Sequence, residues 1–231
     1  DQNSPFWNPN VRKAVSLAID RAGIAHNVLH DTYEPWGSYW GPNSLGYRYR
    51  APDPYDPAQA KKLLAEAGYP DGFDTTFAYP MDQQVASLAV VASLATAGIR
   101  ATAKGYEPTT WGTMLNNNQH TGMGYMHMPQ WGGAYYPDWV WGAEANSWAA
   151  QVSRNFPEVT DILNQMYAAT TEEELKQAVW AAEDFVFEKG WKIPVWSIAG
   201  AFAYGRTVES WPVGWPGSEY AQNLITLKYK G

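Results

Sequence analysis

The side chains best suited to chemistry are large aromatic rings gathered in one short stretch, residues 122–141. A strand-like run over 122–128 is followed by rings spaced by Gly and Pro, which are Trp131, Tyr135, Tyr136, Trp139 and Trp141. This spacing is neither a helical stripe nor a strand alternation. Cores favour Leu, Ile and Val, whereas Trp and Tyr carry an N–H or O–H that needs a partner. Rings on a loop at the end of a strand are suited to stacking on a ligand. The alternative interpretation is that they cover the edge of a sheet.

A second aromatic patch lies earlier, in residues 31–56, where no helical period is present. It contributes Trp36, Tyr39 and Trp40 as further candidate ligand contacts, and Trp111 is another candidate on a short helix expected after Pro108. A loop of this length inside a compact domain is usually functional. The chain holds 13 Trp and 15 Tyr, and flat rings of this kind bind the apolar faces of sugars, bases or peptide side chains.

Composition and charge exclude several classes of function. The net charge is −7 and no Lys/Arg cluster could follow a phosphate backbone, so we expect no nucleic-acid partner. Cysteine is absent, which excludes disulfides, thiolate metal sites and thiol nucleophiles. No apolar run approaches the roughly 18 residues of a membrane span, and no signal-peptide pattern opens the chain. Because it begins abruptly with Asp1, we expect a mature or excised piece.

The sequence predicts neither a cofactor nor an enzyme. His26 and His30 are four residues apart, a spacing that could hold a metal, but no third ligand is in evidence. None of the common Ser-hydrolase, zinc-peptidase or P-loop patterns is present. Glu183 and Asp184 are adjacent on an expected helix and therefore point to different faces. A glycosidase using two carboxylates stays an open alternative, although no candidate pair stands out.

Helix caps and apolar periods divide the chain into regular elements. Asn8, Asp20 and Asp56 are placed as helix N-caps, two of them followed by Pro. A strand over 73–79, a helix over 82–97 and a strand over 99–106 predict one right-handed crossover between parallel strands.

The second half of the chain continues with two helices and several strands. Helices are expected over 157–169 and from the capping box at Thr171 to about Lys189, and strands over 192–197, 202–208 and 223–229. The last of these has the alternation of an edge strand, or of one that pairs with a segment absent from this chain. The fold class expected is α/β, with a mixed, mostly parallel sheet flanked by helices.

Four segments together resemble the extracellular solute-binding proteins of the peptide/nickel class of ABC importers. They are residues 8–24, residues 55–73, the stretch from Trp131 to Asp138, and residues 192–195. The resemblance implies a periplasmic-binding-protein-like C-terminal lobe over 1–209, with a tail over 210–231 that returns to a missing N-terminal lobe. It also implies an ABC permease as partner and a periplasmic or extracellular location, with a lipoprotein anchor on the missing N-terminal part as one option.

One departure from that family's pattern bears on the ligand. Peptide binders carry an aspartate in the motif W-G-A-D, which pairs with the α-amine of the peptide, whereas the matching position here is Ala134 or Tyr135. Neither can offer a carboxylate, and burying an unpaired amine is costly. The resemblance together with the aromatic content therefore favours an oligosaccharide, with a peptide or metal chelate as the alternative.

Overall fold

The fold is described from a computed structural model of the chain. The described residues are 3–39, 46–117, 119–126, 157–190, 192–198, 206, 208–210 and 228–229. Within them, no helix is both long and apolar enough to cross a bilayer.

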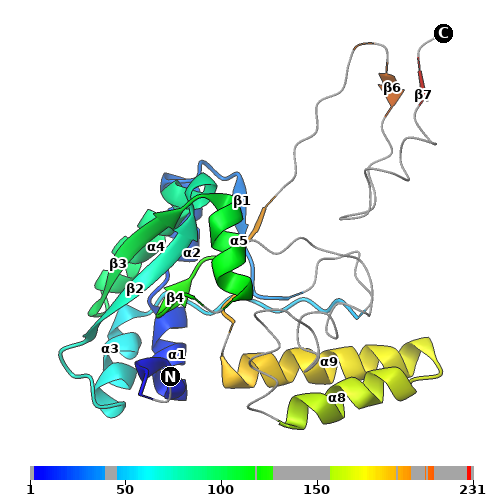
Figure 1. Ribbon diagram of the computed structural model, residues 1–231, viewed down its shortest axis with the longest axis horizontal. Coiled ribbons are helices and arrows are strands. Elements are labelled where there is room, and N and C mark those ends of the chain that lie inside the picture. The colour runs from blue at the N-terminus through cyan, green and yellow to red at the C-terminus, as the bar shows by residue number, and fades with distance from the viewer. Residues whose placement is uncertain are drawn as a thin grey trace.

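The described elements follow one another as an α/β fold (Figure 1). The helices are η1 (Pro5–Trp7), α1 (Pro9–Leu17), α2 (Arg21–Asn27), α3 (Pro57–Glu66), η2 (Met81–Gln83), α4 (Gln84–Ala95), α5 (Pro108–Asn116), α8 (Pro157–Ala168) and α9 (Glu172–Lys189). The strands are β1 (Tyr33–Pro35), β2 (Phe73–Pro80), β3 (Ile99–Tyr106), β4 (Met123–Gly124), β5 (Trp196–Ile198), β6 (Val208–Ser210) and β7 (Lys228–Tyr229).

A parallel three-stranded sheet with the order β3-β2-β4 organises the first half of the chain. β2 and β3 run side by side from Phe73 opposite Ile99 to Pro80 opposite Tyr106. The prediction of two parallel strands joined by a helix is confirmed. The prediction was possible because the apolar alternation and the closing Gly98 mark all three elements locally. β4 joins the other side of β2 over only two residues, and is shorter than the predicted 122–128.

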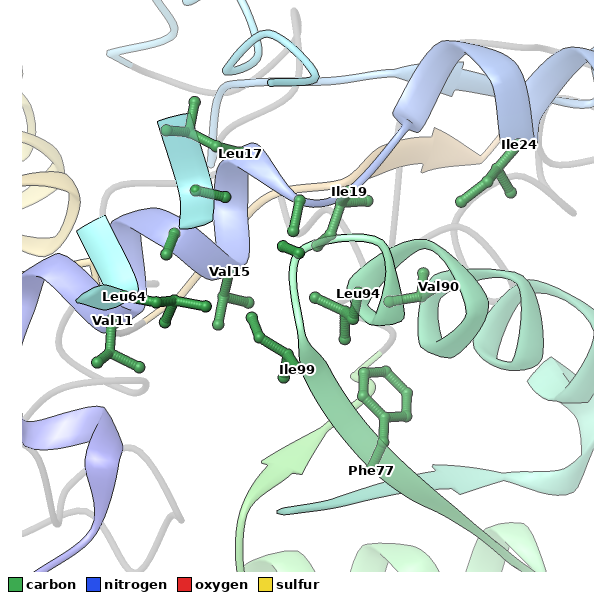
Figure 2. Packing of buried hydrophobic residues seen from close by; sticks show 14 of the residues in the cluster. Val11, Val15, Leu17, Ile19, Ile24, Leu64, Phe77, Val90, Leu94 and Ile99 are labelled. Atoms are coloured by element: carbon green, nitrogen blue, oxygen red, sulfur yellow. The ribbon is translucent and has the colours of Figure 1, made fainter. Parts of the chain in front are cut away.

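The main core lies between this sheet and the helices α1, α3 and α4. Figure 2 shows Val90 and Leu94 of α4 beside Phe77 and Ile99 of the sheet. Leu94 and Ile99 are both fully buried. Continuous burial of this kind is the main favourable contribution to folding, and it holds the strands' carboxyl ends in a fixed arrangement.

Side-chain caps begin the helices where the sequence predicts them. The side chains of Asn8, Asp20 and Asp56 accept hydrogen bonds from the main-chain N–H groups of Asn10, Gly23 and Gln59, at 2.9, 2.9 and 2.8 Å. Each bond satisfies one of the donors that a helix start leaves open. These local bonds explain why the helix starts are readable from the sequence.

The helices α8 and α9 form an antiparallel hairpin with a core of its own. Val159, Leu163 and Met166 of α8 pack against Val179 and Val186 of α9. The predicted capping box at the start of α9 and its left-handed glycine at Gly190 are both present.

Removal of that cap should have a measurable cost. Thr171→Ala is expected to lower the free energy of unfolding by about 1 kcal/mol, because the N–H of Glu174 loses its side-chain acceptor. Urea denaturation measures the change, and Thr160→Ala, an exposed threonine inside α8, is the matched control. Equal midpoints for the two variants would show that the cap contributes nothing.

The remaining strands differ from the predictions in extent and partner. A strand predicted over 192–197 is the shorter β5, and it pairs antiparallel with β1, which lies in a segment predicted to be a loop. β6 begins where the strand predicted over 202–208 ends. β7 pairs antiparallel with β6, so the described end of the last strand has a partner within this chain. Pairings between segments so far apart leave no local signal.

Candidate functional site

The strand order and the helix positions define a topological switch point at β2 and β4. β2 connects through α4 to β3 on one side, and β3 connects through α5 back to β4 on the other side of β2. Phe77 faces the core that contains α4, while its neighbour Ala78 packs against Trp111 of α5. α4 and α5 therefore cover opposite faces of the sheet. Ligands of open α/β sheets bind beyond the carboxyl ends of the strands at such a point.

The carboxyl end of β2 meets the end of β4 and a polar pair from β1 and η2. The N–H of Tyr125 donates to the carbonyl of Ala78 at 2.8 Å, which continues the pairing beyond β4. Tyr33 donates its hydroxyl to Oε1 of Gln83 at 3.1 Å. Burial raises the pKa of Tyr125, and the nearby Tyr33 and Asp82 raise it further. The phenol of Tyr125 therefore keeps its proton and can act as a hydrogen-bond donor.

Glycine is required where the chain enters β4. Gly122 has φ 78°, and a Cβ there would lie 2.5 Å from the carbonyl oxygen of Thr76 on β2. A larger residue would push β4 away from β2. This position therefore fixes where residues 123–126 leave the sheet.

Trp111 is brought to this edge, but its ring is buried. It is 4% exposed, and its Nε1 donates to the carbonyl of Tyr125 at 3.0 Å. It stacks on Tyr106 with 6.1 Å between ring centroids and meets His120 edge-on at 5.3 Å. The structure thus gives Trp111 a packing role that positions the end of β4, whereas its predicted contact with ligand stays a prediction.

Trp36 and Tyr39 lie on the earlier aromatic loop, where Tyr39 packs against α9 and Trp36 lies beside Tyr47 and Val195. The ring of Trp36 stacks on Tyr47 with 6.1 Å between centroids, and the main-chain N–H of Trp36 donates to the carbonyl of Val195 at 3.1 Å. Tyr39 packs on Phe187 at 5.0 Å. In the part of the chain described, no ring contact joins these two residues to Trp111.

The other predicted contacts lie outside the described residues. They are Trp40, Trp131, Tyr135, Tyr136 and Trp139, together with the position of Ala134. Tyr125 and Met126, which precede the aromatic stretch, are described and lie at the switch point. The stretch therefore starts from the edge of the sheet at which this fold places ligands.

Metal binding through the histidine pair gains no support from the described residues. His26 Nδ1 lies 3.1 Å from Asp31 on an exposed surface. Among the described residues no group of three His, Asp or Glu side chains is arranged to hold a metal ion.

An ion-pair cluster that the sequence analysis missed fastens the aromatic loop to α9. Glu183 is fully buried, and its Oε2 accepts from Nε of Arg48 at 2.8 Å, while its Oε1 accepts from the N–H of Tyr39 at 3.2 Å. Asp184 accepts from Arg50 at 2.7 Å and also contacts Arg48. Burial would lower the pKa of Arg48, but its hydrogen bonds to Glu183 and Asp184 outweigh that effect and raise it.

This cluster gives the adjacent acids a structural role. Both carboxylates are engaged by arginines, and they hold the loop rather than facing a common cleft. The sequence does indicate that Glu183 is buried, because it lies one residue after Ala182 and three before Val186 on the buried side of α9. An acid at a core position implies a buried partner.

The arrangement of the sheet and helices defines the class of fold. A parallel α/β sheet with a switch point, flanked by helices, is the architecture of periplasmic-binding-protein-like lobes. A dipeptide-binding protein from Pseudoalteromonas in complex with Met-Leu superposes with a TM-score of 0.72, 23% identity and coverage of 92% of this chain. NikA from Brucella suis in complex with Fe(III)-EDTA superposes with a TM-score of 0.69 at 19% identity over 86% of this chain. At such identities the likeness shows the fold.

The family follows from the sequence comparison. The model of the bacterial extracellular solute-binding proteins, family 5 (middle region), matches residues 1–147. The chain therefore belongs to the family 5 bacterial extracellular solute-binding proteins.

The relatives are longer than this chain. The glutathione-binding protein GsiB of Salmonella choleraesuis is 47% identical over 73 residues, which are 31% of this chain and 14% of that protein. The chain covers 44% of the Pseudoalteromonas protein and 45% of NikA. It thus spans less than half the length of the solved chains it resembles.

Proposed function

We propose that this chain is the C-terminal ligand-binding lobe of a solute-binding protein that delivers its ligand to an ABC permease. Residues 1–209 would form the lobe, and residues 210–231 would cross back to an N-terminal lobe. The observation that carries the proposal is the place where β4 ends at the switch point of the sheet, since Tyr125 and Met126 there directly precede the aromatic stretch in the sequence. A periplasmic or extracellular location fits the family, and a lipoprotein anchor on the N-terminal part is included in the proposal.

The ligand we propose first is a small peptide or peptide-like solute. The relatives named above bind glutathione, hold the dipeptide Met-Leu or hold a metal chelate, and each of these is an oligomeric or multiply charged small molecule. Because Ala134 and Tyr135 offer no carboxylate, such a peptide would be held by ring stacking and main-chain hydrogen bonds rather than by its α-amine.

An oligosaccharide is the second candidate, favoured by the content of 13 Trp and 15 Tyr. Sugar rings present apolar faces that stack on aromatic side chains. The predicted platform is the same in both cases and consists of Trp131, Tyr135, Tyr136 and Trp139.

A titration of the full-length, two-lobed protein separates the candidates. Intrinsic tryptophan fluorescence and calorimetry would be followed with glutathione and di- to pentapeptides, and then with cello-, manno- and xylo-oligosaccharides. Saturable binding of peptides supports the first proposal, and saturable binding of a glycan alone supports the second. Binding of neither class would contradict both. Release of reducing ends during incubation would instead indicate an enzyme.

The mode of peptide binding has its own test. A peptide and its N-acetylated form should bind within about threefold of each other, because Ala134 and Tyr135 offer no carboxylate at the position where peptide binders hold the amine. A loss of about a hundredfold on acetylation would show that another acid holds the amine and would contradict this part of the proposal.

One substitution tests the platform directly. Tyr135→Ala is expected to weaken ligand binding at least about tenfold, since losing a stacked aromatic ring at the centre of a site costs about 1.4 kcal/mol or more. Tyr49→Ala is the matched control, because Tyr49 is 70% exposed. Equal affinity of the two variants, measured by calorimetry on folded protein, would remove Tyr135 from the site.

A further inference from the structure

A cavity of about 190 Å³ lies apart from the carboxyl edge of the sheet, between α1, the segment 50–53, the end of α9 and residues 192–194. None of its lining residues belongs to β2, β3 or β4. Six cationic side chains line it, namely Arg12, Lys13, Arg21, Arg50, Lys189 and Lys192, against two carboxylates, Asp53 and Glu188. The whole chain has 16 Lys and Arg against 23 Asp and Glu. Positive charge is thus concentrated around this cavity, although the chain as a whole carries a net negative charge.

Two of these cations are oriented by neutral main-chain carbonyls. Arg12 donates from Nη1 to the carbonyls of Phe6 and Trp7 at 2.7 and 2.8 Å, and from Nε to that of Lys189. Arg21 donates to the carbonyl of Ser16 at 2.9 Å and to that of Pro194 at 3.1 Å. Carbonyls fix the direction of a guanidinium but leave its full charge in place.

The carboxylates nearby offset only part of this charge. Asp53 bonds to Nζ of Lys13 at 2.7 Å, and Arg50 reaches out of the cavity to Asp184 at 2.7 Å. Glu188 is 3.8 Å from Lys189. Burial favours the neutral form of Lys192, but even without it five cations against two lining carboxylates leave an excess of positive charge around one small space.

Burial makes the charged forms of these cations less stable, because it removes water from around them. Desolvation lowers the pKa of Arg12, lowers that of Arg21 to about 10 and lowers that of Lys192 to about 7. The side-chain nitrogen of Lys192 is buried, although the residue as a whole is only half-buried. Desolvated cations are stabilised when an anion enters the same space.

We propose that this cavity binds a small multivalent oxyanion of the size and charge of inorganic phosphate, which bridges α1 to the end of α9. The volume is below the roughly 300–1,000 Å³ of pockets that take drug-sized ligands, so the space suits a few heavy atoms. Arginine and lysine side chains are the groups that recognise phosphate oxygens. The bridge would add to the hydrogen bond that Arg12 of α1 already donates to the carbonyl of Lys189 at the end of α9, and it is independent of the transported ligand.

Thermal unfolding in phosphate tests the proposal. The melting temperature of the chain is measured in increasing sodium phosphate, with NaCl adjusted to hold the ionic strength constant, and calorimetry follows phosphate binding directly. A saturable rise in melting temperature is expected, because an anion that binds only the folded state stabilises it. Equal melting temperatures in phosphate and chloride, with no heat of binding, would overturn the proposal.

Variants locate the site. Lys192→Met should weaken phosphate binding at least about tenfold without lowering the melting temperature in chloride, because it removes a buried charge but keeps the length of the side chain. Lys62→Met, an exposed lysine on α3 outside the cavity, is the control and should respond as the unmodified chain does. Lys13→Met provides a second test should the first variant fail to fold. A full phosphate response in the cavity variants would place the anion elsewhere and contradict the assignment.

Discussion

Replacing Glu183 by Ala is expected to lower the free energy of unfolding by about 3 kcal/mol. Removing one member of a buried ion pair costs about 3–5 kcal/mol, because the other charge stays behind without its partner. The lower end applies here, since the side chain of Arg48 is 31% exposed and water can partly solvate it. The variant also deprives the N–H of Tyr39 of its acceptor. Urea denaturation followed by circular dichroism measures the loss.

The neighbouring acid provides a matched control for this prediction. Asp184 pairs with Arg48 and Arg50, but its side chain is 53% exposed. Solvent screens such a pair, and Asp184→Asn should cost less than about 1 kcal/mol. The double variant Glu183→Leu with Arg48→Met should recover part of the loss, since it leaves no buried charge. If the two single variants are equally stable, the buried pair is not what fastens the loop.

The same variant should also affect the site. Trp36 and Tyr39 lie on the loop that Arg48 and Glu183 tie to α9. Loss of the tie would free the loop and should reduce the affinity for ligand if these rings contact it. Binding unchanged in a destabilised but folded Glu183 variant would remove Trp36 and Tyr39 from the list of ligand contacts.

Replacing Leu94 by Ala should cost about 3 kcal/mol or more. Leu94 is fully buried between α4 and the sheet, where Figure 2 shows it near Ile99. A buried Leu→Ala change loses about 2–5 kcal/mol through lost contacts and the cavity left behind. The measurement is again the free energy of unfolding in urea, and the melting temperature should fall by several degrees.

Leu88 lies on the same helix and tests whether burial is the cause. It is 41% exposed, so Leu88→Ala should cost under about 1 kcal/mol, since much less apolar area returns to water. Both substitutions change helix propensity equally. Ala is a slightly better helix former than Leu, so propensity cannot explain a loss at either position. Similar losses for Leu88 and Leu94 would therefore show that burial in the core is not what sets the cost.

The two halves of the described fold have different roles in the proposed function. The parallel sheet and its helices place the carboxyl ends of β2 and β4, where Tyr125 leads into the aromatic stretch. The α8–α9 hairpin holds the earlier aromatic loop through Glu183. The earlier aromatic loop is thus attached to a rigid element, as a binding surface requires, and the later stretch follows the end of β4 in the sequence.

Local patterns were sufficient to predict the main helices and the two long strands β2 and β3, but not β1 or the extents of β4 and β5. The caps at Asn8, Asp20 and Asp56, the capping box at Thr171 and the final Gly190 all act within a few residues. Interactions at such short range depend on residue type and spacing alone. The crossover from β2 to β3, and the resemblance to a family that the comparison confirmed, follow from the same readable segments.

Only the tertiary structure decided which distant side chains meet. Arg48 and Glu183 are 135 residues apart, and Arg21 lies 173 residues from the carbonyl of Pro194 that it contacts. The same holds for Trp111, whose type suggested a ligand contact but whose burial against Tyr125 follows from the return of β4 to the sheet. Burial and ion pairing depend on three-dimensional neighbours, and a sequence period fixes only which face of an element a residue occupies.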